Sequence, residues 1–209
     1  MRGSDNVERE SRLSAEELRG FATIAGLCAE ALLTLPDEAL VERVRRVQQE
    51  VGEPPYRGME GKDLVQRYYD RFFVPASSCF VPLAESCVRA AHVEGGVRRF
   101  GSFGGMHAAH VLRCYQAAGF DCRAIAGYDL AVKNLKPDSM ACELLFMAAL
   151  AEKAGAADGH SCDLLVQFAD EHAARWMPDA ADALRERGED LYSQVCGMAA
   201  RAVADLVSG

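Results

Sequence analysis

The sequence lacks the features that mark membrane-spanning, secreted and nucleic-acid-binding proteins. It has no uninterrupted run of about 18 apolar residues, so we expect no membrane span. Its first residues are polar and acidic, without the apolar segment of a secretory signal. The chain has 23 basic and 31 acidic residues, and the net charge of −8 argues against nucleic acid as a partner.

Motifs of catalysis and of nucleotide binding are also missing. None of the eight cysteines forms a C-x-x-C pair, and their scatter predicts reduced, mostly buried thiols in a cytosolic protein. The glycine-rich segment at residues 101–105 lacks the Lys-Ser/Thr pair of a phosphate loop. No G-x-S-x-G motif and no orderable Ser/His/Asp triad occurs. The sequence offers no positive evidence for an enzyme, and we expect no cofactor.

Apolar residues recur at helical spacing along most of the chain, and no strand-like alternation is apparent. Ser14 and Glu17 match a capping box that opens a helix ending at Leu33. Further helices are predicted over residues 36–51, 61–74, 83–93, 106–118, 140–155, 158–176, 179–187 and 189–207. We therefore predict a single-domain, all-α bundle of about nine helices over residues 14–209, which could be subdivided near 119–137. Residues 1–13 are interpreted as a disordered or expression-derived N-terminus.

The helix over residues 140–155 is apolar on every side, so we expect other helices to surround it. Glu143 is its one charged residue between Met140 and Leu150, and a buried carboxylate needs a partner. Asp138 and Ser139 precede the helix and suggest an exposed carboxylate loop with a capping hydroxyl.

Three side chains on the helix at 106–118 could bind a metal ion. His107, His110 and Cys114 lie at positions i, i+3 and i+7, and imidazole and thiolate both suit zinc. Val111 and Ala118 share that face, so packing in the core is the favoured interpretation, and no metal is assigned.

Aromatic residues are concentrated on the helix at 61–74. They form either part of the core or a groove for a peptide segment, in which aromatic anchors would carry much of the binding energy. The four residues are Tyr68, Tyr69, Phe72 and Phe73. A later set with helical spacing, Phe168, His172 and Trp176, is expected on one helix face within the core.

Five segments in this order resemble the TorD/DmsD (NarJ-like) family of cytoplasmic molybdoenzyme-maturation chaperones. Residues 69–75 (YDRFFVP) are similar to the family's Tyr-x-x-Leu-Phe-x-x-Pro, and residues 82–86 (PLAES) to its Pro-Tyr-Glu-Ser. Tyr115 with Gly119-Phe120 resembles the next helix end. Residues 137–147 (PDSMACELLFM) resemble its Pro-Asp-His loop and following helix, and residues 168–178 its late helix. Ser139 and Ala84 stand where the family has His and Tyr.

The resemblance implies a cytoplasmic, non-enzymatic protein. Such a protein would bind the twin-arginine signal peptide of an apo-molybdoenzyme catalytic subunit and hold it until the molybdopterin cofactor is inserted. It would act as a monomer or homodimer, without stable membrane insertion. The implied peptide-binding residues are Tyr69, Phe72, Phe73, Pro75, Glu85, Asp138, Ser139 and Glu143, with His172 and Trp176 as structural family positions. Two alternatives stay open: a metal protein or enzyme using His107, His110 and Cys114, and nucleotide binding as a side function.

Overall fold

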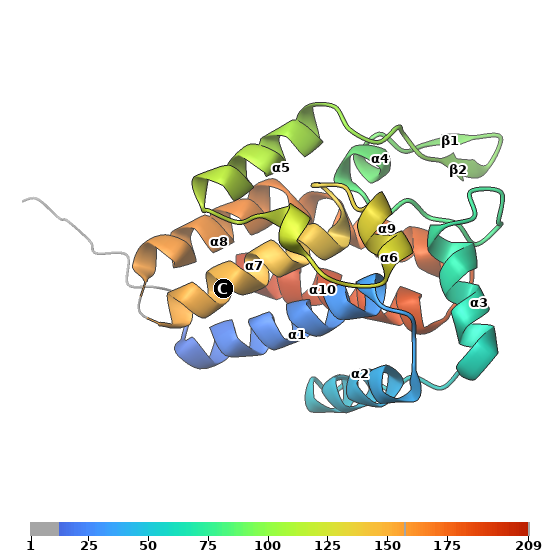
Figure 1. The fold of residues 1–209 in the computed structure, drawn as a ribbon, viewed down its shortest axis with the longest axis horizontal. Helices are drawn as coiled ribbons and strands as arrows, with labels where there is room; N and C mark the ends of the chain where they lie inside the picture. The colour runs from blue at the N-terminus through green and yellow to red at the C-terminus, as the bar shows by residue number, and fades with distance from the viewer. Residues whose placement is uncertain (1–12, 157, 209) are drawn as a thin grey trace, which may run out of the picture.

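A computed structural model describes residues 13–156 and 158–208, and helices dominate them (Figure 1). This part of the chain contains ten α-helices, two 3-10 turns and one small hairpin, which confirms the all-α prediction. In chain order the elements are α1 (Ala15–Leu33), α2 (Glu38–Glu50), α3 (Gly61–Phe72), α4 (Glu85–Arg89), β1 (His92–Glu94), β2 (Val97–Arg99), α5 (Met106–Ala117), η1 (Cys122–Ala124), α6 (Asp129–Asn134), α7 (Met140–Gly155), α8 (Gly159–Glu171), η2 (Ala173–Arg175), α9 (Met177–Glu186) and α10 (Leu191–Ser208).

Capping residues set several helix ends where the sequence predicts them. The Ser14 hydroxyl accepts a hydrogen bond from the Glu17 amide (3.2 Å), and the Glu17 carboxylate accepts one from the Ser14 amide (2.7 Å). The predicted capping box is therefore present. Gly119 follows the end of α5 with φ of 69°, a conformation that glycine adopts without a steric penalty.

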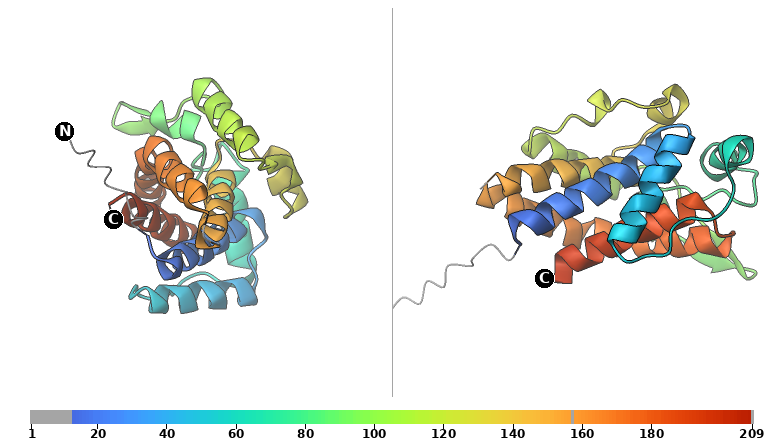
Figure 2. Two further views of the ribbon diagram at one scale, coloured as in Figure 1. Left: turned by 90° about the vertical axis from the view of Figure 1, so that its left-hand side faces the viewer. Right: turned by 90° about the horizontal axis from the view of Figure 1, so that it is seen from below.

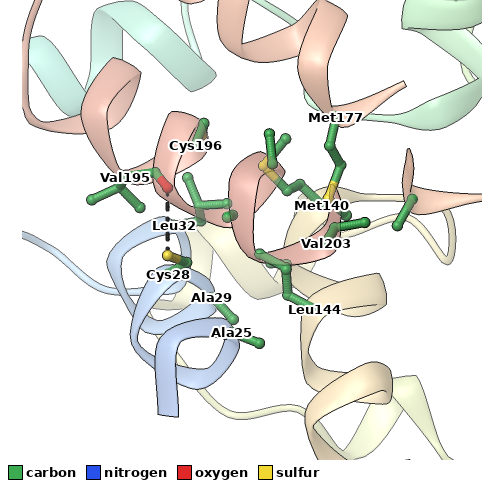
Figure 3. Packing of buried hydrophobic residues seen from close by; sticks show 14 of the residues in the cluster. Ala25, Cys28, Ala29, Leu32, Met140, Leu144, Met177, Val195, Cys196 and Val203 are labelled. Atoms are coloured by element: carbon green, nitrogen blue, oxygen red, sulfur yellow. Dashed lines mark hydrogen bonds between the residues drawn. The ribbon is translucent and has the colours of Figure 1, made fainter. Parts of the chain in front are cut away.

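Helix α7 lies at the centre of the bundle. It packs against α1 and α8, while α10 packs against α1 and α9, and these helices lie side by side in the orthogonal views of Figure 2. Small residues of α1, Ala25 and Ala29, bring that helix close to Leu144 of α7 (Figure 3). The Cys28 thiol donates a hydrogen bond to the Val195 carbonyl of α10 at 3.4 Å. The expectation that other helices enclose α7 is confirmed.

Several predicted helix boundaries are wrong. The helix expected over residues 83–93 is reduced to the five residues of α4, and the hairpin of β1 and β2 follows it. Gly95 and Gly96, with φ of 58° and 78°, form the two-residue turn that closes the hairpin. The helix expected over 158–176 ends at Glu171, and the connection at 121–136 contains η1 and α6. The predicted helix at 61–74 ends at Phe72.

A buried ion pair joins α3 to the start of α10. Arg71 Nε donates to Asp190 Oδ2 at 2.8 Å, and both side chains are buried. The other guanidinium nitrogens donate to the carbonyl oxygens of Cys79 and Gly188. Asp190 Oδ1 also accepts from the Ser193 amide at 3.0 Å, so one carboxylate pairs with a cation and caps a helix.

No helix within residues 13–156 and 158–208 combines the length and the apolarity needed to cross a bilayer. Five of the eight cysteines are buried, which agrees with the expectation of mostly buried thiols. Burial raises the pKa of the Cys142 thiol to about 12, so this side chain behaves as an apolar core residue.

Candidate functional site

An apolar groove of about 580 Å³ opens between α3, α6 and the segment that leads into α4. Phe72 and Phe73 at the end of α3 line it, and both residues are only partly buried. Its remaining lining comes mainly from apolar residues: Leu32, Leu33, Pro75, Phe80, Val81, Pro82, Leu83, Ala84, Phe103, Leu130, Ala131, Leu135 and Ala141, with Asn134, Lys136 and Ser139 as the polar positions. Four residues implied by the family resemblance, Phe72, Phe73, Pro75 and Ser139, thus share one surface.

The aromatic cluster of α3 supports the wall of this groove. Tyr68 is buried and donates its hydroxyl hydrogen to the Leu32 carbonyl at 2.9 Å. Its ring packs edge-on against Phe72, with centroids 5.4 Å apart. Tyr69 does not line the groove, because its hydroxyl turns to that of Tyr128, 2.8 Å away. The cluster therefore divides into a core part and a part that lines the groove, and the partly buried Phe72 and Phe73 belong to the second.

Asp138 is buried, so the expectation of an exposed carboxylate loop is wrong. Its side chain is 0% exposed, and Oδ2 accepts a hydrogen bond from the Ser86 amide at 2.9 Å. Its carbonyl oxygen accepts from the Glu85 amide at 2.8 Å. Met140 in turn donates to the Leu83 carbonyl at 3.0 Å. Asp138 therefore fastens the start of α7 to the start of α4 and does not face solvent.

Ser139 follows Asp138 and has the capping role that the sequence predicts. Its hydroxyl accepts from the Cys142 amide at 3.4 Å, at the first turn of α7. A β-bridge pairs it with Ala84 across the same junction. Ser139 is half-buried and lines the groove, so the capping residue also belongs to the exposed surface.

Glu85 is the centre of a buried polar network. Its Oε1 accepts from Arg89 and its Oε2 from His172 Nδ1, each at 2.7 Å. Burial acts to raise the pKa of Glu85, but the hydrogen bonds from His172 and Arg89 outweigh it and hold the pKa below its ordinary value. His107 lies 3.5 Å from Oε1 at the edge of the network. Glu85 is therefore an ionised carboxylate whose oxygens already have partners.

Glu143 has the partner that the sequence argument requires. Trp176 Nε1 donates to Glu143 Oε2 at 2.9 Å, and both side chains are fully buried. Burial raises the pKa of Glu143 well above its usual range, and the negative charge of Glu85 adds to the effect. Among the described residues, Glu143 Oε1 has no hydrogen-bond partner. This geometry gives Glu143 a structural role between α7 and the segment that begins α9.

The His and Cys residues assemble differently from the sequence prediction. His110 and Cys114 of α5 meet His172, and not His107, with their ligand atoms within 4.8 Å of one another. His107 turns to Glu85 instead. The prediction that Phe168, His172 and Trp176 share one helix face is wrong, because α8 ends at Glu171 and η2 intervenes. All three side chains are nevertheless buried, as expected.

Sequence reasoning missed the contribution of α6 and of the linker before α4. Leu130, Leu135 and Phe80 line the groove, although none of the predicted helices covers residues 121–136. The available signal was weak: helical spacing places Leu130, Ala131 and Leu135 on one side of a short helix, but α6 has only six residues.

Comparison with known proteins identifies one family. The family described as "Nitrate reductase delta subunit" matches residues 36–182, which cover most of the chain and include α3, the groove segment and α7. Neither a search of curated proteins nor a search of solved structures gives a significant match. The match over residues 36–182 shows that the chain belongs to the nitrate reductase delta subunit family, the NarJ/TorD-like chaperones of molybdoenzyme maturation.

Proposed function

We propose that this chain binds the twin-arginine signal peptide of a molybdopterin-dependent oxidoreductase subunit in the cytoplasm and holds it until the cofactor is inserted. The observation that carries the proposal is the apolar groove of about 580 Å³ at Phe72, Phe73 and Pro75. A signal peptide contains an apolar run, and burial of that run against aromatic and aliphatic side chains supplies binding energy.

A second pocket next to the groove suits the arginine pair. It measures about 680 Å³, and its polar lining consists of four carboxylates and one cation: Asp37, Glu38, Glu42, Glu60 and Arg45. Arg45 already pairs with Glu60 and Glu42. Neither Asp37 nor Glu38 has an ion-pair partner within the described residues. Asp37 Oδ1 caps α2 by accepting from the Leu40 amide at 2.7 Å, so Asp37 Oδ2 and the Glu38 carboxylate are available for a guanidinium.

The two pockets are close enough for one peptide. Leu33 lines the groove and Pro36 lines the acidic pocket, so three chain positions separate them. An extended chain covers at most about 11 Å over three residues. A short extended peptide with two arginines directly before an apolar run could therefore occupy both pockets.

The buried carboxylates act on the site indirectly in this proposal. Asp138 and Glu85 fix the junction between α4 and α7, and Ala84 and Ser139 of that junction line the groove. Glu143 supports the junction from the core side through Trp176. We expect these three residues to position the groove wall and the exposed carboxylates of the acidic pocket to contact arginine.

Isothermal calorimetry with a synthetic twin-arginine peptide tests the proposal. We expect saturable binding that weakens as salt increases, because exposed ion pairs are screened. The variant Phe72→Ala should lower the affinity about tenfold, since an aromatic anchor typically contributes more than about 1 kcal/mol. The double variant Glu38→Gln/Glu42→Gln should make the peptide affinity less dependent on salt. It should not change the part of the affinity that comes from the apolar groove.

Matched variants provide the controls. Phe100 is partly buried outside the groove, where it packs beneath the Arg187 guanidinium, so Phe100→Ala should leave binding unchanged. A peptide in which both arginines are replaced by glutamine should bind more weakly than the twin-arginine peptide to the wild type. The difference between the two peptides should be smaller for the double Glu→Gln variant, which keeps only the Asp37 and Glu60 carboxylates in the pocket. Binding that is insensitive to Phe72→Ala and to loss of both arginines would contradict the proposed site.

A further inference from the structure

Two histidines and a cysteine converge where α5 crosses the end of α8. His110 Nδ1 lies 2.8 Å from His172 Nε2, and all three ligand atoms, including Cys114 Sγ, lie within 4.8 Å of one another. The two imidazole rings stack with centroids 4.9 Å apart. Residues of α5 and of the position directly after α8, 62 positions apart in sequence, thus direct nitrogen and sulfur atoms to one point.

A buried carboxylate orients the central histidine. Glu85 is held as an anion by Arg89 at 2.7 Å, so its Oε2 accepts hydrogen from His172 Nδ1, also at 2.7 Å. Because the hydrogen of His172 is on Nδ1, Nε2 carries the lone pair, and this nitrogen faces His110 and Cys114. A carboxylate–histidine arrangement of this kind fixes the tautomer and the ring direction of histidines that bind metals.

The cluster can be reached from solvent. A pocket of about 160 Å³ opens on it, and His110 and Cys114 line this pocket and are only partly buried. Phe146 and Phe168 form apolar walls, and the exposed carboxylate of Glu171 lies at the rim. The pocket therefore offers an entry path and a place for a fourth ligand.

The geometry matches a tetrahedral ion after a small movement. Zinc–nitrogen bonds of about 2.0 Å require the two nitrogens to lie about 3.3 Å apart, slightly more than the 2.8 Å observed. His172 is fixed by Glu85 and by stacking on Phe168, whereas His110 is half-buried and can move. A shift of about half an ångström by His110 would satisfy the two zinc–nitrogen bond lengths. The Cys114 sulfur lies within 4.8 Å of the nitrogens and would have to approach to about 3.5 Å from each, which a zinc–sulfur bond of about 2.3 Å requires.

We propose that His110, Cys114 and His172 form a binding site for a divalent transition-metal ion of the zinc class, with Glu171 or water as the fourth ligand. Two imidazoles and a thiolate suit zinc and cobalt and discriminate against magnesium and calcium. Binding releases one proton from the Cys114 thiol, and the hydrogen on His110 moves from Nδ1 to Nε2. The bound ion would link α5 to the end of α8.

Titration of the full chain with Co²⁺ tests the site, because tetrahedral cobalt absorbs in the visible range and a thiolate ligand adds a charge-transfer band in the near ultraviolet. We expect saturation at one ion per chain, both bands, and displacement of cobalt by Zn²⁺. Cys114→Ser should abolish the charge-transfer band, and His110→Ala should abolish tight binding. Glu85→Gln should weaken cobalt binding about 10- to 100-fold, since it removes the carboxylate charge that holds His172 in this tautomer.

Two variants serve as matched controls. Cys122 is half-buried outside the cluster and His160 is exposed at the start of α8, so Cys122→Ser and His160→Ala should leave both bands unchanged. Far-ultraviolet circular dichroism of each variant confirms that the helices form. The proposal is overturned if well-folded wild type shows no saturable cobalt spectrum, or if the spectrum persists in Cys114→Ser and His110→Ala.

Discussion

Replacement of Glu143 by glutamine should make the protein more stable at neutral pH. Glutamine has nearly the shape of a protonated carboxyl group, and its oxygen can accept the hydrogen bond that Trp176 Nε1 now donates to Glu143 at 2.9 Å. The pKa of Glu143 is raised in the folded chain by burial from an ordinary value of 4.5. Above that ordinary value the unfolded chain loses the proton while the folded chain keeps it, so wild-type stability falls as pH rises.

The pH dependence sets the size of the stability difference between the wild type and Glu143→Gln. For each pH unit between the ordinary and the folded pKa, the free energy of unfolding of the wild type decreases by about 1.4 kcal/mol because of this one group. Glu143→Gln lacks that contribution, so its stability advantage should grow by about 1.4 kcal/mol per pH unit above about pH 4.5. The advantage should stop growing once pH exceeds the folded pKa.

Urea unfolding measures this difference directly. Trp176 is the single tryptophan of the chain and the partner of Glu143, so its fluorescence reports on the site, and far-ultraviolet circular dichroism reports on the helices. Glu152 is exposed on the same helix, and Glu152→Gln should show no pH-dependent gain. A constant difference between wild type and Glu143→Gln across the pH series would refute the reasoning, because Glu143 would then have the same pKa in both states.

Three further substitutions have defined outcomes in the same urea assay. Asp190→Asn leaves the buried Arg71 guanidinium without an anion and should cost about 3–5 kcal/mol, whereas an effect below about 1 kcal/mol would mean that water or other carbonyls compensate. Gly127→Ala places a Cβ 2.6 Å from the Leu33 carbonyl and should cost about 1–3 kcal/mol through displacement of the chain; full retention of stability would show that this close approach is not required. Ser14→Ala removes the N-terminal cap of α1 and should lower the free energy of unfolding by about 1 kcal/mol. An unchanged urea midpoint would show that the capping box makes no net contribution to stability.

Local signals in the sequence predict the main helices well. Ser14 and Glu17 mark the start of α1, and Ser139 marks the start of α7, because capping depends only on residues within one turn. The apolar character of α7 on every side likewise predicts its enclosure. These features need no information from distant parts of the chain.

The site is less predictable because distant segments assemble it. Asp138 looks exposed in sequence, since a Pro-Asp-Ser loop is typical of a surface turn, but the Ser86 amide that it caps lies 52 residues away. Helical spacing groups His107 with His110 and Cys114, yet the third member of the cluster is His172, the residue directly after α8. Spacing within a helix identifies residues on one face and does not reveal which other element packs on that face.

The short elements around α4 are predicted wrongly for a different reason. Residues 83–93 carry a helix-like apolar pattern, but the chain leaves the helix at Arg89 and forms the exposed hairpin closed by Gly95 and Gly96. A two-residue turn with positive φ at both glycines competes with helix propagation, and such local alternatives differ by small free energies. The same reasoning applies to α6, which is too short for a periodic pattern to be convincing.

The placement of α1 between α7 and α10 has a consequence for synthesis of the chain. The apolar face of α1 is made first, but its packing partners come from the last third of the sequence. Likewise, Arg71 beside the groove finds its anion at Asp190, 119 residues later. Contacts so distant in sequence form late, so α1 and the groove wall should stay unprotected on the ribosome until α10 has emerged. We therefore expect the groove to become competent for a peptide only after translation has passed α10.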